Sequence, residues 1–312
     1  MRTRALLLLI ICVVLCSCKK RQDLKTIKIG TFFNAIDYAP FYVAKQQGWF
    51  EQSDVLQGLN IEFFEYGARS EFSSEIQNKN LHLIFAAEPP IIITKAQGVN
   101  LKIAGLSCTL QQEILVQKNA PYNKVSEINK SNIAVLQSTS SHYGLLKIIK
   151  DYGVDSLVTI RTVSPLEAKN LFENENIDGW AVWPPFVEEQ LILGNGKILE
   201  GGDATIQSVM AIPDFVINDY PKIATEFCHI LEKSKEWILN HPQESKNIVS
   251  RAVGQEYDVV DLAWPKHNWS AVLNDKLISD IQNKSEFLAN QGETRNNRIV
   301  KVANELIFSC QD

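Results

Sequence analysis

Short strand-like segments alternate with helix-like segments along most of this 312-residue chain, and this alternation constrains the fold more than any other feature. The segment TIKIGTFF places Ile27 and Ile29 on one face, as a strand does. The next segment, PFYVAKQQG, begins with Pro40, which suits the first helical position, and ends with Gly48, which suits a helix stop. The repeated pattern predicts an α/β fold with a mainly parallel sheet and helices on both faces.

The texture of the chain changes after residue 220. Four segments then have apolar residues three and four apart, as amphipathic helices do. They are residues 221–242, 242–254, 274–292 and 293–308. No low-complexity linker separates any two parts of the chain. Two α/β units joined without such a linker suggest lobes that share crossover strands, with a ligand in the cleft between them.

The first residues have the layout of a signal peptide. Arg2 and Arg4 precede an apolar run over 5–15, which is too short to span a bilayer as a mature helix. The run ends in Leu-Cys-Ser-Cys, which resembles a bacterial lipobox with Cys18 as the lipidated first mature residue. We therefore expect a signal peptide over 1–17, a lipidated tether over 18–24 and a body anchored at a membrane surface. An uncleaved anchor or an ordinary secretory signal is the less favoured alternative.

Charge, cysteines and motifs exclude several classes of function. The formal charge is −5 and there is no basic patch, so nucleic acid is not an expected partner. Cys108, Cys228 and Cys310 are widely spaced and form no zinc pattern. Buried free thiols are favoured over the one disulfide that they could form. Motifs for dinucleotides, phosphates, a serine nucleophile or a zinc protease do not occur, so we expect no catalytic residue, metal or cofactor.

One stretch carries more hydroxyl groups than a helix needs. Ser138, Thr139, Ser140 and Ser141 precede His142 and a helix-periodic apolar run. A helix N-terminus has unpaired N–H groups and a partial positive charge, so it can bind an anion. His142 could donate from its ring, or carry a charge if its pKa is raised. A redundant helix cap with a structural histidine is an equally good interpretation.

Two further stretches contain candidate ligand-binding residues. In IDGWAVWPPF, Asp178 could hold a polar or cationic group and Trp183 could wall a pocket. The loop after the first strand carries Phe33, Asn34, Asp37 and Tyr38, which suit a small polar organic ligand. Such loops lie at the carboxyl edge of the sheet, where open α/β sheets bind ligands. The alternatives are core packing for Trp183 and ordinary turns for the polar residues.

In order along the chain, four segments resemble the sulfonate, taurine and nitrate substrate-binding proteins of ABC importers. They are residues 29–52, 89–105, 136–154 and 163–188. The resemblance implies a two-lobed periplasmic binding fold of type II, each lobe a mixed sheet flanked by helices, with a helical C-terminal segment. Lobe one would comprise 25–107 and 215–312, and lobe two would comprise 108–214. Crossovers would fall near 108–113 and 210–215 and act as hinges.

The resemblance also implies a ligand site and partners. Ser140, Ser141 and His142 would supply the ligand-facing helix start, and Asp178 and Trp183 would face them. Residues of lobe one would close the site, namely Asn34, Asp37, Tyr38, Ala87 and Glu88. The ligand would be a small anion such as a sulfonate or taurine, or an aromatic heterocycle such as a thiamine-precursor pyrimidine or riboflavin. The acidic residues and aromatic walls suit a heterocycle at least as well as a sulfonate.

The expected partners are an ABC permease and its ATPase. We expect the protein to be a monomer that is lipid-anchored to a bacterial membrane and faces the periplasm or the exterior. Two alternatives belong to other classes. One is an enzyme related to thiamine-precursor or menaquinone-pathway synthases, although the lipobox and the lack of a cysteine-rich motif argue against it. The other is a ligand-sensing lipoprotein that acts through a separate membrane partner.

Overall fold

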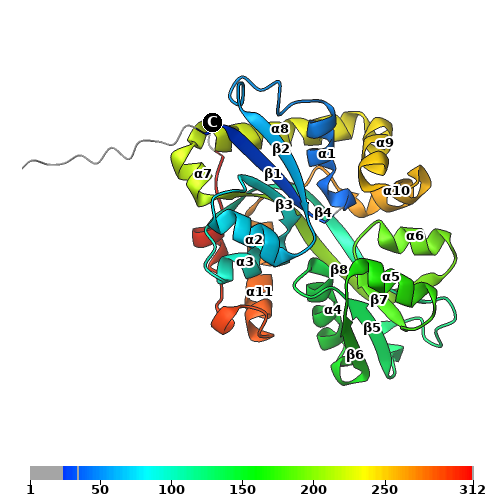
Figure 1. Cartoon of the computed structure of the whole chain (residues 1–312). Coiled ribbons are helices and arrows are strands. Elements are labelled where there is room, and N and C mark those ends of the chain that lie inside the picture. The colour runs from blue at the N-terminus through cyan, green and yellow to red at the C-terminus, as the bar shows by residue number, and fades with distance from the viewer. Residues whose placement is uncertain (1–23, 34, 311–312) are drawn as a thin grey trace, which may run out of the picture.

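The computed structural model describes residues 24–33 and 35–310. In that part of the chain, nine strands form one sheet with the order β2-β1-β3-β8-β4-β7-β5-β6, and β9 pairs with β4 (Figure 1). The strands are β1 (Thr26–Phe32), β2 (Asn60–Tyr66), β3 (Leu83–Ala87), β4 (Leu101–Gln117), β5 (Ser131–Val135), β6 (Val158–Thr162), β7 (Gly179–Val182), β8 (Gly196–Pro213) and β9 (His267–Asn268).

Helices cover the sheet and continue to the C-terminal part of the chain (Figure 1). Their bounds are α1 (Ala39–Gln46), α2 (Arg69–Gln77), α3 (Glu88–Ala96), α4 (Ser140–Asp151), α5 (Pro165–Glu173), α6 (Phe186–Ile192), α7 (Asp214–Asp219), α8 (Pro221–Asn240), α9 (Pro242–Val253), α10 (Tyr257–Ala263) and α11 (Asp275–Asn290). Proline begins α5, α8 and α9, and Ser164 caps α5 by accepting a hydrogen bond from the Glu167 N–H. Local residue chemistry therefore sets several helix starts.

The sheet is mixed, so the expectation of a mainly parallel sheet is wrong for its centre. The outer pairs β1–β2, β1–β3, β5–β6 and β5–β7 are parallel. The central strands β4 and β8 pair with each other and with β3 and β7 in antiparallel fashion. Both strands are long, with 17 and 18 residues, and they join the α/β lobe around β1–β3 to the lobe around β5–β7 (Figure 1).

The described buried apolar residues form two clusters. The larger cluster packs the strands β1, β3, β4 and β8 against helices that include α1, α3 and α8, and it continues into the other lobe through Phe172 of α5 and Trp180 of β7. The smaller cluster lies in the lobe around β5–β7 and includes Val116, Ile133, Leu145 and Ala181. The predicted crossovers at 108–113 and 210–215 coincide with β4 and with the end of β8. The exact lobe boundaries remain a prediction.

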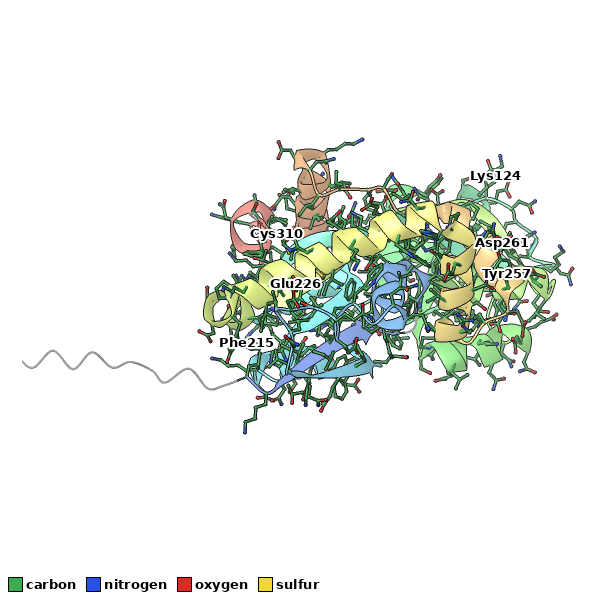
Figure 2. All side chains as sticks on the ribbon, turned by 90° about the horizontal axis from the view of Figure 1, so that it is seen from above. Lys124, Phe215, Glu226, Tyr257, Asp261 and Cys310 are labelled. Carbon is green, nitrogen blue, oxygen red and sulfur yellow. A yellow bond between two sulfur atoms is a disulfide. The ribbon has the colours of Figure 1, made fainter. Side chains whose placement is uncertain are left out.

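A disulfide between Cys228 of α8 and Cys310 links the long helix to the C-terminal segment (Figure 2). The expectation of free thiols is therefore wrong for these two residues, although Cys108 is a buried free thiol. The bonded cysteines lie 82 residues apart in the sequence, with their Cα atoms 6.4 Å apart in space. Their spacing in the sequence does not indicate this pairing, which depends on how the C-terminal segment packs against α8.

The expectation of a helix over 293–308 is also wrong. The chain there forms a 3-10 turn at Arg295–Asn297 and a π-helical stretch at Val302–Leu306. Its backbone then runs beside β4, where the Phe308 N–H donates to the Ile103 carbonyl at 2.9 Å. The spacing of apolar residues in this segment favours a helix, but hydrogen bonding to β4 holds the backbone in a different conformation.

Within residues 24–33 and 35–310, no helix has the length and apolarity that a membrane crossing needs. The predicted signal peptide, the tether and Cys18 lie outside the described residues.

Candidate functional site

A small cavity lies where the end of β1, the start of α4 and the end of β7 meet. Its lining residues are Phe32, Phe33, Ala35, Asp37, Tyr38, Ala87, Pro90, Gln112, Thr139, Ser140 and Trp183. Seven of these were predicted as ligand-binding residues from the sequence. The cavity is small, with a volume of about 10 Å³. A larger ligand can enter only if the surrounding elements move apart.

Aromatic rings from both lobes meet at this cavity. Phe33 follows β1 in a left-handed conformation, with φ of 62°, which is rare for a non-glycine residue. Its ring lies 5.1 Å from the ring of Trp183, which follows β7 in the other lobe. This cross-lobe pair forms one wall, and Tyr38 and Pro90 also line the cavity. Asn34, the remaining candidate in this loop, lies outside the described residues.

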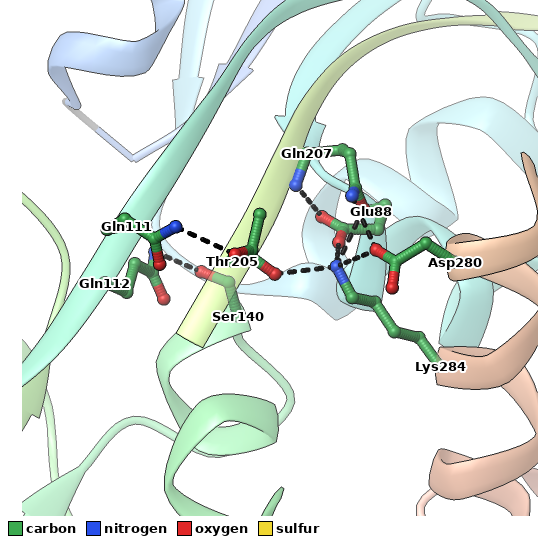
Figure 3. Close-up of polar contacts among 8 residues, drawn as sticks. All are labelled: Glu88, Gln111, Gln112, Ser140, Thr205, Gln207, Asp280 and Lys284. Carbon is green, nitrogen blue, oxygen red and sulfur yellow. Dashed lines mark hydrogen bonds and ion pairs between the residues drawn. The ribbon is translucent and has the colours of Figure 1, made fainter. Parts of the chain in front are cut away.

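The run of hydroxyl groups before α4 is explained by its hydrogen bonds. Thr139 is the cap: its Oγ1 accepts from the His142 N–H at 3.3 Å. Gln112 of β4 donates to the Ser140 Oγ at 2.7 Å (Figure 3). It also accepts from the Ser141 hydroxyl at 3.2 Å. Ser138 takes a left-handed turn, with φ of 61°, and is not among the lining residues. The start of α4 is therefore tied to the crossover strand.

His142 is buried behind the cavity and does not line it. Its Nδ1 lies 3.5 Å from the Ser138 N–H, which donates to it, and 3.6 Å from the Glu293 carboxylate. Burial lowers the pKa of His142 to about 4. The imidazole is therefore neutral near pH 7, and a charge arising from a raised pKa is not what the structure supports.

Asp37 brings a carboxyl group into the cavity wall. It is 3% exposed and lies in a 3-10 turn at Ile36–Tyr38. Its backbone carbonyl accepts a hydrogen bond from the Ser107 hydroxyl. Burial raises the pKa of the Asp37 carboxyl to about 6; the nearby Ser208 hydroxyl lowers it and the charge of Glu88 raises it. Its Oδ1 is buried and has no hydrogen-bond partner in the described part of the chain.

Glu88, another predicted ligand residue, does not line the cavity. It begins α3, is fully buried, and pairs with the ammonium of Lys284 from α11 (Figure 3). Its Oε2 accepts from the Gln207 N–H of β8 at 2.9 Å. Lys284 also donates to the Thr205 carbonyl at 2.8 Å and lies 3.0 Å from Asp280. The charge of Glu88 is thus used to hold α11 against β8.

Asp178 lies at the wrong end of β7 to face the cavity. Strand β7 separates it from Trp183, and a rise of about 3.3 Å per residue puts the two roughly 16 Å apart. The Asp178 Oδ2 accepts from the Asn132 N–H at 2.7 Å. It lines a different hollow, of about 460 Å³, beside Gln117 and Asn195. Asp37 is therefore the one charged residue that lines the cavity among those described.

Gln112 was missed by sequence reasoning. It is 4% exposed in the long apolar strand β4, whereas its neighbour Gln111 is exposed. A polar residue at an inward-facing strand position was the available signal. No group of three or more metal-ligating side chains was found in residues 24–33 and 35–310.

A larger hollow, of about 560 Å³, lies in the lobe around β1–β3. Its lining includes Lys45 of α1, Phe63 and Glu65 of β2 and Arg251 of α9. It is open to solvent and includes no residue from the lobe around β5–β7. The smaller cavity is the better candidate, because residues of both lobes meet there at strand ends.

A family model described as "NMT1/THI5 like" matches residues 35–245. The chain belongs to the NMT1/THI5-like family. The NMT1/THI5-like chain is also 23% identical over 276 residues to a "Putative aliphatic sulfonates-binding protein" of Bacillus subtilis, covering 85% of this chain and 81% of that protein. The predicted resemblance to sulfonate-binding proteins is thereby confirmed.

Solved structures agree on the fold. The periplasmic aliphatic sulphonate binding protein of Escherichia coli superposes with a TM-score of 0.77 at 16% identity, covering 91% of this NMT1/THI5-like chain and 92% of that one. The alkanesulfonate-binding protein of Xanthomonas axonopodis pv. citri, bound to MOPS, gives 0.77 at 18% identity, covering 90% and 97%. The predicted two-lobed periplasmic binding fold is confirmed.

Proposed function

We propose that this protein is the extracytoplasmic solute-binding component of an ABC importer, which captures a small ligand between its two lobes. The observation that carries the proposal is the composition of the cavity. Phe33 and Asp37 come from the lobe around β1–β3, and Ser140 and Trp183 come from the other lobe. A ligand at this position would touch both lobes at once. The sulfonate-binding relatives support an importer role.

Binding by both lobes gives a mechanism without bond chemistry. A ligand that contacts both lobes stabilises the closed arrangement by its differential affinity for that state. The crossover strands β4 and β8 would absorb the rotation. Beside them, Lys266 pairs with Glu113 of β4 and lies 2.6 Å from the buried Glu188 of α6. These ion pairs hold the segment after α10 against the other lobe in the closed arrangement.

The lining suits a ligand with an acceptor group and an apolar or flat part. The start of α4 offers helix N-terminal N–H groups and the Ser140 hydroxyl. The rings of Phe33 and Trp183 can contact an alkyl chain or a heterocycle. The ligand is therefore a small sulfonate-like anion or a heteroaromatic compound. The hydroxyls of Ser140 and Thr139 hydrogen-bond Gln112 and the Leu136 carbonyl rather than a base, so the cavity favours binding over catalysis.

The cellular setting follows from the N-terminal segment. A signal peptide over 1–17 and a lipid on Cys18 would place the body outside the cytoplasm, tethered to a membrane. There a monomer in its closed form would dock on the permease, and the ATPase would drive release.

A thermal-shift panel tests the proposal. The purified protein is heated with ethanesulfonate, taurine, nitrate, 4-amino-5-hydroxymethyl-2-methylpyrimidine or riboflavin. A ligand present at 100 times its Kd should stabilise the fold by about 2.7 kcal/mol. Ser140→Ala should reduce that shift, whereas Ser156→Ala, at an exposed position, should not. The proposal fails if no compound raises the Tm, or if both variants keep the full shift.

A further inference from the structure

Among the described residues that line the cavity, the Asp37 Oδ1 is a buried acceptor and the Trp183 Nε1 a buried donor without hydrogen-bond partners. We propose that the ligand carries a nitrogen-bound hydrogen that donates to the Asp37 carboxylate, together with an acceptor for the indole N–H of Trp183. This inference rests on the proposed function, because it places the ligand in the same cavity. It excludes a simple anion and names an amino compound as the ligand class.

Asp37 is poised to accept a hydrogen bond. Its Oδ1 is buried and has no hydrogen-bond partner among the described residues, although the nearby Ser208 hydroxyl, itself without a partner there, lowers the pKa of the carboxyl. Burying a carboxylate oxygen without a donor costs free energy, which a ligand N–H would recover on binding. Asp37 is one of the residues that line the cavity, which places its carboxyl group beside a ligand bound there.

Charges around the cavity reinforce this requirement. No lysine or arginine is among the described lining residues. The ammonium of Lys284 lies beside Glu88, but it is held by Glu88, Asp280 and Gln207. Glu88 itself adds negative potential at Asp37. A second anion beside Asp37 would be repelled, whereas an ammonium or amino group would be attracted.

Trp183 supplies the complementary feature. Its Nε1 is buried and also lacks an acceptor among the described residues. It belongs to the same wall as the start of α4, which likewise favours an acceptor group. The ligand therefore has an acceptor toward Trp183 and Ser140 and an N–H donor toward Asp37. Aminoalkanesulfonates and amino-substituted heterocycles share this chemistry.

Matched compounds that differ in the amino group test the inference by isothermal titration calorimetry. One pair is taurine and ethanesulfonate, and the other is 4-amino-5-hydroxymethyl-2-methylpyrimidine and its analogue lacking the 4-amino group. Each is titrated into the wild type, Asp37→Asn and the exposed control Asp155→Asn. In the wild type, the amino member of the pair that binds should bind at least about tenfold more tightly. Asp37→Asn should remove most of that preference, and Asp155→Asn should keep it.

Equal binding of the two members by the wild type would overturn the inference, and so would an unchanged preference in Asp37→Asn. The wild-type comparison stands even if the variant does not fold. If none of the four compounds binds, the wild type is incubated with a bacterial small-molecule extract and analysed by native mass spectrometry. A captured ligand with an N–H group supports the inference, and one without it overturns the inference alone. Capture of no ligand defeats the proposed function as well.

Discussion

The ammonium of Lys284 pairs with the carboxylate of Glu88, which lies 196 residues earlier in the chain. Both side chains are almost fully buried. The pair fastens α11 to the start of α3, one residue after Ala87, which lines the cavity. Because Lys284 holds Glu88, the Glu88 carboxylate does not line the cavity, although the sequence analysis predicted it as a ligand-binding group. The C-terminal helix is thus part of the support for the ligand site.

Lys284→Met should destabilise the fold strongly, because it leaves the Glu88 carboxylate buried without its cation. Removing one partner of a buried ion pair costs about 3–5 kcal/mol. Urea denaturation measures the free energy of unfolding. Lys276→Met, at an exposed position of the same helix, is the control and should change it by less than about 0.5 kcal/mol. Equal effects of the two substitutions would contradict this role for Lys284.

Gln112→Ala should weaken ligand binding, because Gln112 holds Ser140 and Ser141 at the start of α4. Losing these two hydrogen bonds should lower affinity about tenfold. Gln111→Ala is the matched control, since Gln111 is exposed and bonds Thr205 instead. Calorimetry with whichever ligand stabilises the wild type measures both. Similar Kd values for the two variants would show that the tether to β4 does not position the helix.

Breaking the disulfide should lower stability. A loop of 82 residues closed by Cys228 and Cys310 is worth about 3–5 kcal/mol in the unfolded-chain entropy model. Cys228→Ser should show this loss in urea, and a reductant should produce the same loss in the wild type. A reductant should then have little further effect on Cys228→Ser. Alkylation of both cysteines in denaturant without reductant would show that the bond is absent.

His142 should make the fold sensitive to acid. Its pKa is lowered to about 4 in the folded state against 6.5 when unfolded, so the unfolded chain binds the proton first. The stability that depends on neutral His142 is therefore complete above pH 6.5 and is lost as the pH falls toward 4, by about 2–3 kcal/mol. His142→Gln should lose less stability over this window than the wild type. Parallel pH profiles would contradict a buried neutral imidazole.

Features set by neighbouring residues were predictable from the sequence. Pro165 and Ser164 define the start of α5, and the threonine before Ser140 defines the start of α4, because capping depends on groups a few residues apart. Phe33 and Trp183 were predicted separately from the ends of different strands. Their meeting follows from the rule that such ends gather at one edge of a sheet.

Features that depend on distant partners were not predictable. Asp178 was predicted to bind ligand because its partner, the Asn132 N–H, lies 46 residues away in the sequence. Glu88 looked available because its partner Lys284 lies at the other end of the chain. Gln112 was hidden because nothing local marks that β4 continues to Gln117. In each case the position of the residue is set by a contact between segments that are distant in the sequence, and such contacts cannot be predicted from one sequence.

A crystal structure of the protein with its bound ligand tests the central claim most directly. We predict electron density for the ligand between the rings of Phe33 and Trp183, with a nitrogen at hydrogen-bond distance from Asp37 and an acceptor facing Ser140. Density instead in the larger hollow beside Lys45 and Arg251, with the cavity between the lobes unchanged, would contradict it.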